Sequence, residues 1–459
     1  MLFSRRGFLC GSSAVAFSSS AFMRLLAEPA EAAAGSTIVI VYEFSGGNDG
    51  FNMVIPLDAT NFGYYNTLRS NIAVPIAAID TAQTYFDAAP SPVGSGSTYA
   101  FNPAMTMLRS LYAQGVVAVV SGLGLEPTVP NRQSHQAGQY YWASGSVSAN
   151  NTSNLGWVGQ TFDVLGGSGN ISPMVAVMGG TPTAMRGVKT SPLVVSGDLA
   201  NFKVNTGAAG ASGNLALAGN DAYATSAVSA EFARALGVAT TNYVSVVQNY
   251  AKAVNPDQVG GGPLSPSYPV TPAYPPYNLM ITYPGKAAKT SGIKVQMAQI
   301  ARLILGAAPA RSYYVRQGGY DTHSGEVAQQ PLLLQEFSEA VTEFYTYLKG
   351  LGASTNVVIV TTSEFGRLAY SNASAGTDHG TASFHFVIGD RAKGGYYGVK
   401  PYPDLTPGLS GKYIGVDIDF RYHLSNIMQF LGVDPSGVLG TTAFTNLAGA
   451  GAGLDKLLS

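Results

Sequence analysis

Nearly continuous runs of apolar, β-forming residues that end in polar loops are the feature that most constrains the fold of this chain. They cover Ile38–Phe44, Val116–Val120 and Val357–Val360, and Ser312–Arg316 predicts a further short strand. Runs without polar alternation are typical of strands buried on both faces of a parallel sheet. The sequence therefore predicts an α/β fold built on a mainly parallel sheet.

Segments with the spacing of amphipathic helices separate these runs. They lie at 103–112, 293–304 and 333–348, and each is closed by a glycine: Gly115, Gly306 and Gly350. The first segment and the strand after it form an αβ unit, which favours parallel strands. The stretch at about 160–290 is different, because it is rich in Gly, Ala, Ser, Pro and Tyr. It predicts a loop-rich insertion that acts as a lid or a substrate-facing cap.

Ligand-type side chains follow the ends of the predicted strands, on loops that also carry glycine or serine. They are Asp49, Asp321, His323, Glu364, Asp378 and His379. The carboxyl ends of parallel strands share one edge of a sheet, so these groups are expected to converge. Carboxylates and imidazoles without a thiolate match Zn²⁺, Mn²⁺ or Mg²⁺. One or two such ions would clamp the attacking and leaving oxygens of a phosphoryl or sulfuryl ester.

Two of these loops also have a simpler interpretation as plain turns. The Gly47–Gly50 segment around Asp49 fits a plain turn equally well. The alternative for Asp321 and His323 is an exposed turn with an incidental histidine. Their spacing of two residues in an extended loop projects both side chains to one side, which suits joint metal ligation.

Ser134 lies where a helix running through Trp142 would begin. As an N-cap, its hydroxyl would bond the first-turn amides, and residue types alone favour this interpretation. The alternative makes Ser134 a nucleophile. The positive end of the helix would then stabilise negative charge on it, and Arg132 would orient an oxyanion. A second cation, Arg367, follows the strand that ends near Glu364 and could counter charge on a transferred group.

The N-terminus indicates export. Ser4–Leu9 places paired arginines ahead of an apolar, Ala/Ser-rich segment, and residues 30–34 offer A-x-A cleavage sites. This looks like a twin-arginine (Tat) signal over residues 1–34, with an ordinary secretory signal or a retained anchor as the alternatives. Residues 35–459 are then one mature domain, delivered by the Tat translocase to the periplasm or the exterior.

Composition narrows the class of partner. The net charge is −1 and charged residues make up 11% of the chain, against a usual quarter. No basic run suggests nucleic acid, and no apolar segment after the signal is long enough to cross a membrane. The only cysteine, Cys10, lies in the signal, so the mature chain has no disulfide and no thiolate chemistry. The partner expected is a small molecule or a neutral polymer.

Six short motifs occur along the chain in a fixed order: Gly46–Gly50, Arg132–His135, Gly156–Gly159, Gly318–His323, Ser363–Arg367 and Gly376–Gly380. In this order they resemble the Tat-exported "domain of unknown function 1501" family, a sulfatase-like branch of the alkaline phosphatase superfamily. The resemblance covers most of the mature chain apart from 160–290. It implies a doubly wound, alkaline-phosphatase-like α/β core with helices on both faces and a metal site at one sheet edge.

Carried over by position, the resemblance implies metal ligation by Asp49 after the first strand. It also implies ligation by Asp321 and His323 after a middle strand. His379, together with Asp378, resembles the late histidine ligand of the superfamily.

Departures from the superfamily pattern bear on activity. Glu364 stands where an Asp-His pair is common, and Phe365 occupies the histidine position, so one metal site is short of a ligand. Ser134 resembles the nucleophile at a helix start, although it is farther from Asp49 than expected. Without a cysteine in the mature chain, a sulfatase that uses formylglycine made from cysteine is excluded.

The leading hypothesis is an exported metal-dependent hydrolase of phosphate, sulfate or related esters on a small-molecule or polymer-borne substrate. Ser134 or a metal-activated water would be its nucleophile, and Arg132 or Arg367 would counter charge. The alternative is a non-catalytic exported binding or envelope-assembly protein on a degenerate phosphatase/sulfatase scaffold. The missing histidine, the low-complexity insertion and the Tyr-rich composition leave this alternative open.

Overall fold

The computed structural model describes residues 37–79, 85–87, 98–148, 154–166, 173–195, 279–306, 308, 310–398, 415–441 and 458. The expected signal at 1–34 lies outside these residues, and so does most of the expected insertion, from 196 to 278. Within the described ranges, no helix combines the length and the apolar character needed to cross a bilayer.

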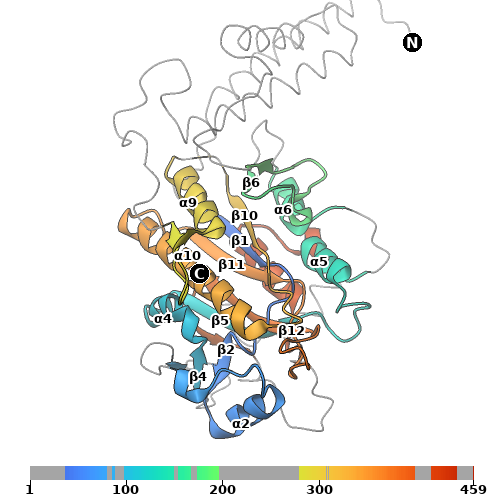
Figure 1. The fold of residues 1–459 in the computed structure, drawn as a ribbon. Helices are drawn as coiled ribbons and strands as arrows, with labels where there is room; N and C mark the ends of the chain where they lie inside the picture. Colours follow the sequence, from blue (N-terminus) through green and yellow to red (C-terminus); the bar gives the residue numbers. More distant parts are fainter. Residues whose placement is uncertain are drawn as a thin grey trace, which may run out of the picture.

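A mixed sheet forms the centre of the molecule (Figure 1), and nine of the described strands belong to it. Its main path runs in the order β13 (Gly395–Tyr397), β5 (Val117–Gly124), β12 (Ala382–Ile388), β11 (Val357–Ser363), β1 (Ile38–Phe44), β10 (Ser312–Gln317), β6 (Met174–Ala176) and β7 (Leu193–Val194), and β14 (Ile418–Asp419) also pairs with β5. Strand β1 is parallel to both β10 and β11, whereas β12 is antiparallel to its two neighbours. The predicted α/β class with a mainly parallel sheet is confirmed.

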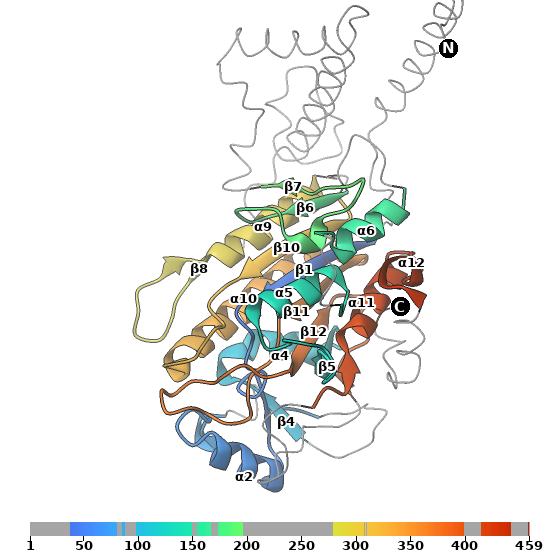
Figure 2. The same cartoon turned by 90° about the vertical axis from the view of Figure 1, so that its right-hand side faces the viewer.

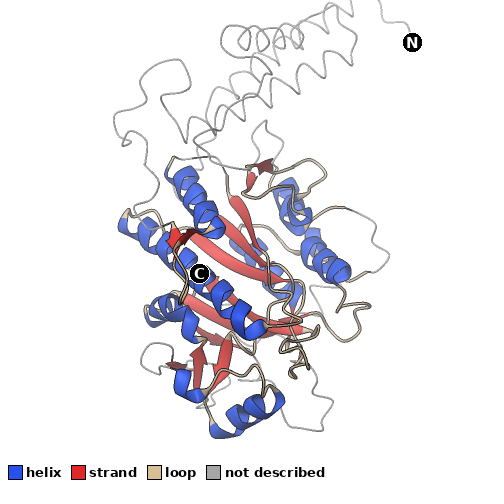
Figure 3. Cartoon of the chain, viewed as in Figure 1, coloured by secondary structure: helices blue, strands red, loops and turns tan. Residues whose placement is uncertain are grey.

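Helices cover both faces of this sheet, as Figures 2 and 3 show. They are α4 (Thr106–Ala113), α9 (Gly292–Leu305) and α10 (Glu326–Gly350) on one face, and α5 (His135–Ser144), α6 (Trp157–Val164) and α11 (Phe420–Phe430) on the other. Successive side chains of a strand point to opposite faces. Accordingly Ile40 belongs to the core under α9 and α10, whereas Val41 belongs to the core under α5 and α6. This double burial explains why the strand sequences lack polar alternation.

Smaller elements extend the fold beyond the central sheet. They are a three-stranded sheet of β2 (Val54–Pro56), β3 (Tyr85–Asp87) and β4 (Thr98–Phe101), helix α2 (Ala59–Leu68), the pair β8 (Met280–Ile281) and β9 (Lys289–Thr290), and the short helix α12 (Ser436–Leu439). Strands β6 and β7 lie inside the range where the sequence predicts an irregular insertion, yet they pair within the main sheet. The described part of that range is therefore more regular than its composition suggests.

Helix α10 starts earlier than the sequence pattern indicates. The apolar spacing begins near residue 333, but the helix begins at Glu326 and contains Pro331. The backbone amide of Glu326 donates to the carbonyl of Ala375 at 2.8 Å, so a tertiary contact holds this first turn. Local periodicity carries no information about such a contact.

Two histidines are buried beside each other on the α11 face. His385 on β12 and His423 on α11 have ring centroids 6.4 Å apart, and both are 1% exposed. Burial lowers the pKa of His385 to about 3 and that of His423 to about 4. Both rings are therefore neutral in the folded protein at ordinary pH.

These pKa shifts predict acid sensitivity. The unfolded chain binds a proton on each histidine near pH 6.5, well above the folded values, so it binds more protons than the folded chain on acidification. The contribution is fully present above about pH 6.5 and falls by about 1.4 kcal/mol per pH unit for each histidine below it. We expect His423→Asn to make the slope of unfolding free energy against pH shallower by about that amount between about pH 6 and 4.5. Urea denaturation across this range measures both slopes, and an unchanged slope would contradict burial of a neutral His423.

Candidate metal centre

Four side chains from three separate segments meet at the edge of the sheet where β1, β5, β10 and β11 end. Each offers one ligand atom, and these atoms all lie within 4.8 Å of one another: His135, Asp321, His323 and His379. His135 is the first residue of α5, Asp321 and His323 lie between β10 and α10, and His379 lies between β11 and β12. The parallel strands bring these segments together, as the sheet-edge argument predicts.

The ligand atoms face a common point. The Nε2 atoms of His323 and His379 are 2.8 Å apart. One carboxylate oxygen of Asp321 lies 3.1 Å from Nε2 of His323 and 3.5 Å from Nε2 of His379. Its other oxygen lies 3.4 Å from Nε2 of His135. Three imidazole nitrogens and one carboxylate thus surround a single small volume.

Each histidine uses its other ring nitrogen, Nδ1, to contact an oxygen outside the cluster. The pairs are His135 with Glu364 at 2.6 Å, His323 with Asp378 at 3.2 Å and His379 with the carbonyl of Gln133 at 2.7 Å. Because these oxygens are acceptors, we assign the proton to Nδ1, which leaves a lone pair on Nε2. Metal-ligating histidines have this arrangement.

The donor set fits a divalent metal ion. With both protons on Nδ1, the Nε2 lone pairs of His323 and His379 lie 2.8 Å apart and repel each other, and either a shared cation or a proton on one Nε2 relieves this repulsion. Three imidazoles with one carboxylate suit Zn²⁺, whereas Mg²⁺ prefers oxygen ligands. The side chains of Asp321 and His323 are 46% and 44% exposed, so one side of the site faces solvent.

The charges around the cluster favour its metal-binding protonation state. Burial opposes ionisation of Asp321, but the hydrogen bond and charge of Arg367 outweigh it, with further help from His135 and His323, and the pKa of Asp321 is lowered. Burial also lowers the pKa of His379. Asp321 is therefore ionised and His379 neutral near pH 7, the forms in which both bind metals.

The structure separates Asp49 from this group. Asp49 is 1% exposed and forms an ion pair with the buried Arg69, and its other oxygen accepts from the amide of Phe51 at 3.2 Å. Burial raises the pKa of Asp49, which the charge of Arg69 only partly offsets. The sequence predicts Asp49 as a metal ligand. In the structure, its carboxylate instead pairs with Arg69, a residue that the sequence pattern does not single out.

Glu364 and Asp378 contact the ligands from outside. One oxygen of Glu364 contacts His135, and the other accepts from the amide of Gly46 at 2.9 Å. Both acids contact a histidine Nδ1 atom and lie outside the four-residue cluster, in place of the direct ligation expected from sequence. Phe365, expected to mark a missing ligand, packs its ring 4.9 Å from His135 and 4.3 Å from His379.

His135 is the cluster residue that the sequence did not predict. It supplies an imidazole beside Phe365, where the motif comparison finds none. A signal was present, because His135 follows Ser134 at a predicted helix start. The partner that gives it a role, Glu364, is 229 residues away along the chain, and no local pattern predicts that pairing.

Arg367 acts as a clamp between loops. Its side chain is fully buried and bonds one oxygen of Asp321 at 2.6 Å. Its remaining acceptors are backbone carbonyls on three loops: Gly46, Gly47, Tyr320 and Thr377. With its guanidinium enclosed by these partners, Arg367 has no access to a transferred group, which corrects the charge-countering role expected from sequence.

Ser134 occupies the N-cap position of α5 but makes no capping hydrogen bond through its side chain. It is exposed, and its own amide bonds the carbonyl of Asn131 at 2.8 Å in the preceding turn. Ser134 is therefore at the predicted N-cap position, but its hydroxyl does not make the predicted capping bond. Arg132 lies two residues earlier and is partly buried.

The buried contacts of the Arg367 guanidinium predict a large loss of stability in Arg367→Ala. The substitution leaves buried carbonyls and the Asp321 carboxylate without their donor, at an expected loss of about 3–5 kcal/mol of unfolding free energy. The control Arg186→Ala, at an exposed arginine, should change the unfolding free energy by less than about 0.5 kcal/mol. Urea denaturation of both variants measures these free energies. Equal midpoints in the two variants would show that the buried contacts of Arg367 do not stabilise the fold.

No protein of curated function matches the sequence. Solved structures that resemble the chain include the lipoteichoic acid synthase LtaP from Listeria monocytogenes, with 8% identity over 93% of this chain and 77% of that one, at a TM-score of 0.34. Ps i-CgsB in complex with k-i-k-neocarrahexaose shows 10% identity over 90% and 77%, at 0.34. A Bacteroides thetaiotaomicron protein from work on glycosaminoglycan metabolism (BT33494S-sulf) shows 9% identity over 89% and 74%, at 0.32.

A family comparison covers the part of the chain that holds most of the cluster. Residues 284–409 include β10, α10 and β11, and with them Asp321, His323 and His379. This stretch matches the model of the family described as "Protein of unknown function (DUF1501)".

Proposed function

We propose that this protein is an exported, metal-dependent hydrolase of phosphate, sulfate or related esters, built on an alkaline-phosphatase-like core. The observation that carries the proposal is the convergence of three Nε2 atoms and the Asp321 carboxylate on one point, with every Nδ1 atom already held from outside. Among the described residues this is the one group with such geometry, so the proposal is for a single ion. Zn²⁺ suits the donor set best.

A divalent ion held there would polarise an ester oxygen and lower the pKa of a water molecule. The residues of the chain prepare the site for it. Arg367 fixes Asp321 from the buried side, and Glu364 fixes the ring of His135. The opposite side is open to solvent, since Asp321 and His323 are both exposed, and an ester can approach from there.

Ser134 is the proposed nucleophile. Its hydroxyl makes no capping bond, and its neighbour His135 is one of the four cluster residues. The N-terminus of α5, with its unpaired amides and its dipole, stabilises negative charge that develops beside it. A water molecule is the competing nucleophile, and a substitution separates the two.

The cellular setting is part of the proposal. The paired arginines within Ser4–Leu9 support export by the Tat translocase to the periplasm or the exterior. A small-molecule or polymer-borne ester fits the near-zero net charge, which also argues against a nucleic-acid partner.

Metal content and turnover test the proposal together. We expect the purified protein to bind about one Zn²⁺ per chain and to hydrolyse at least one of an aryl phosphate, phosphodiester, phosphonate or sulfate. Asp321→Asn should weaken metal binding by more than about 100-fold, because loss of even an outer partner of a ligand costs 10–100-fold. Asp434→Asn, at an exposed acid outside the cluster, is the control.

Elemental analysis and chelator competition measure metal binding. Absence of both bound metal and turnover with Zn²⁺, Mn²⁺ or Mg²⁺ would reject the hydrolase. Metal binding without turnover would favour the binding-protein alternative.

Ser134→Ala tests the nucleophile. If Ser134 attacks the ester, the variant should keep its metal and lose turnover by about 1,000-fold or more, as nucleophile removal does in other hydrolases. Single-turnover assays with metal analysis on the same sample measure this. Turnover close to wild type would assign the attack to water.

A further inference from the structure

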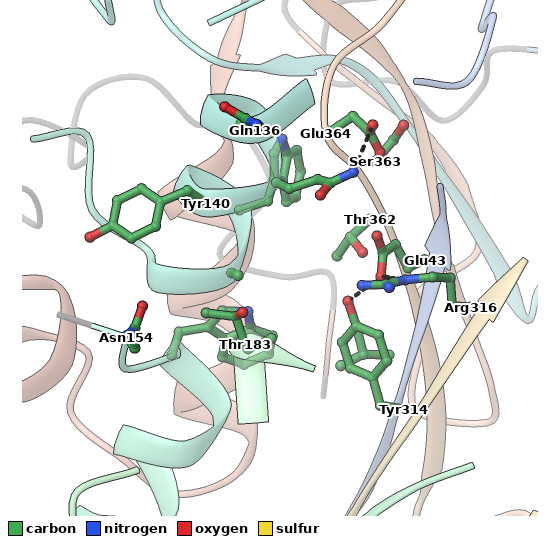
Figure 4. A pocket seen from close by; sticks show the side chains of 16 residues that line it. Glu43, Gln136, Tyr140, Asn154, Thr183, Tyr314, Arg316, Thr362, Ser363 and Glu364 are labelled. Atoms are coloured by element: carbon green, nitrogen blue, oxygen red, sulfur yellow. Dashed lines mark hydrogen bonds and ion pairs between the residues drawn. The ribbon is translucent and has the colours of Figure 1, made fainter. Parts of the chain in front are cut away.

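A cavity of about 270 Å³ lies beside the metal centre, between α5 and the sheet (Figure 4). It extends to Glu364, whose carboxylate contacts His135 at 2.6 Å, so it ends one contact away from a cluster histidine. Its volume is just below the roughly 300–1,000 Å³ of pockets for drug-sized ligands. The cavity therefore suits one ring-sized chemical group.

The walls of the cavity differ in chemistry. The sheet wall carries Glu43, Tyr314 and Arg316, in which one oxygen of Glu43 accepts from the Tyr314 hydroxyl at 2.7 Å and from Nε of Arg316 at 2.6 Å. Figure 4 shows Tyr140 and Asn154 on the opposite side, on and near the helices. Planar carboxylate, guanidinium and amide groups on facing walls can each bond two neighbouring hydroxyls.

Charge in the cavity is balanced within the protein. Glu43 is paired with Arg316, and Glu364 contacts His135. Among the described residues that line the cavity there is no lysine, and the one arginine is already paired, so the cavity is poorly suited to an anionic group. The lining instead suits a neutral ligand that donates and accepts many hydrogen bonds.

Aromatic side chains complete the lining. Trp142 and Trp157 both border the cavity, and they are the only two tryptophans in the chain. Indole and phenol rings pack against apolar C–H faces, while their neighbours bind the polar edge of a ligand. A pyranose ring has such a C–H face together with a rim of hydroxyls.

We propose that this cavity binds one neutral sugar ring, which would lie between α5 and the Glu43–Arg316 wall. None of the four cluster residues lines the cavity, and Glu364 and the ring of His135 lie between the cavity and the other cluster residues. The cavity is therefore a binding site of its own, separate from the open side of the cluster.

Tryptophan emission reports on this cavity directly, because both tryptophans line it. Titrating the full protein with a panel of neutral methyl glycosides should give a saturable emission change for at least one of them. Inorganic phosphate and adenosine are the comparison probes and should give none. A response to adenosine with none to any glycoside would overturn the sugar assignment in favour of a nucleoside.

Two variants from opposite walls locate the binding. Glu43→Gln keeps the shape of the side chain, and Asn154→Ala changes an exposed residue with little risk to folding. Each should weaken glycoside binding about 3- to 10-fold, the loss expected for one hydrogen bond. The control Asn66→Ala, on an exposed part of α2 away from the cavity, should leave binding unchanged. Equal binding in Asn154→Ala, Glu43→Gln and the control would reject this site.

Failure of this inference and failure of the proposed function give different results. Turnover of aryl esters without any glycoside response would reject the sugar site and keep the hydrolase. A glycoside response without turnover of any ester would reject the hydrolase and keep the sugar-binding cavity.

Discussion

The buried guanidinium of Arg367 is the interaction on which the rest of the site depends. It joins the loops that follow β1, β10 and β11 by bonding their backbone carbonyls, and it holds Asp321 at the exposed end. Burial of a cation costs free energy unless each of its N–H donors has an acceptor. The loops that supply these acceptors are therefore restricted to one arrangement. Two of these loops carry cluster residues, Asp321 and His323 on one and His379 on the other, and Arg367 thereby holds them where they converge.

Close backbone approach is the second requirement at this edge. Gly46 adopts a φ of +118°, and a Cβ there would come within 2.4 Å of the Asp321 amide. Gly47 adopts a φ of +81°, and a Cβ there would meet the ring of Phe365 at 2.1 Å. These glycines allow the β1 loop to lie against the ligand loops, and they let Phe365 pack its ring against two of the cluster histidines.

Glu364 lies between the candidate metal centre and the cavity. Glu364 contacts His135 through one oxygen and accepts from Gly46 through the other, while it also borders the cavity. A ligand in the cavity would contact this carboxylate, and through it the ring of His135.

Much of the fold and part of the site follow from local sequence. Unbroken apolar runs identified the central strands, and their polar ends identified Asp321, His323 and His379, because burial on two faces and the shared edge of a parallel sheet are properties of short segments. The roles of Asp49, Glu364, Asp378 and Arg367 were different from those expected, and His135 was missed. Each depends on a partner far away in the chain, such as Arg69 for Asp49 or Glu364 for His135. Sequence thus determined which chemical groups reach the edge of the sheet, and only tertiary packing decided which of them form the candidate metal cluster and which contact it from outside.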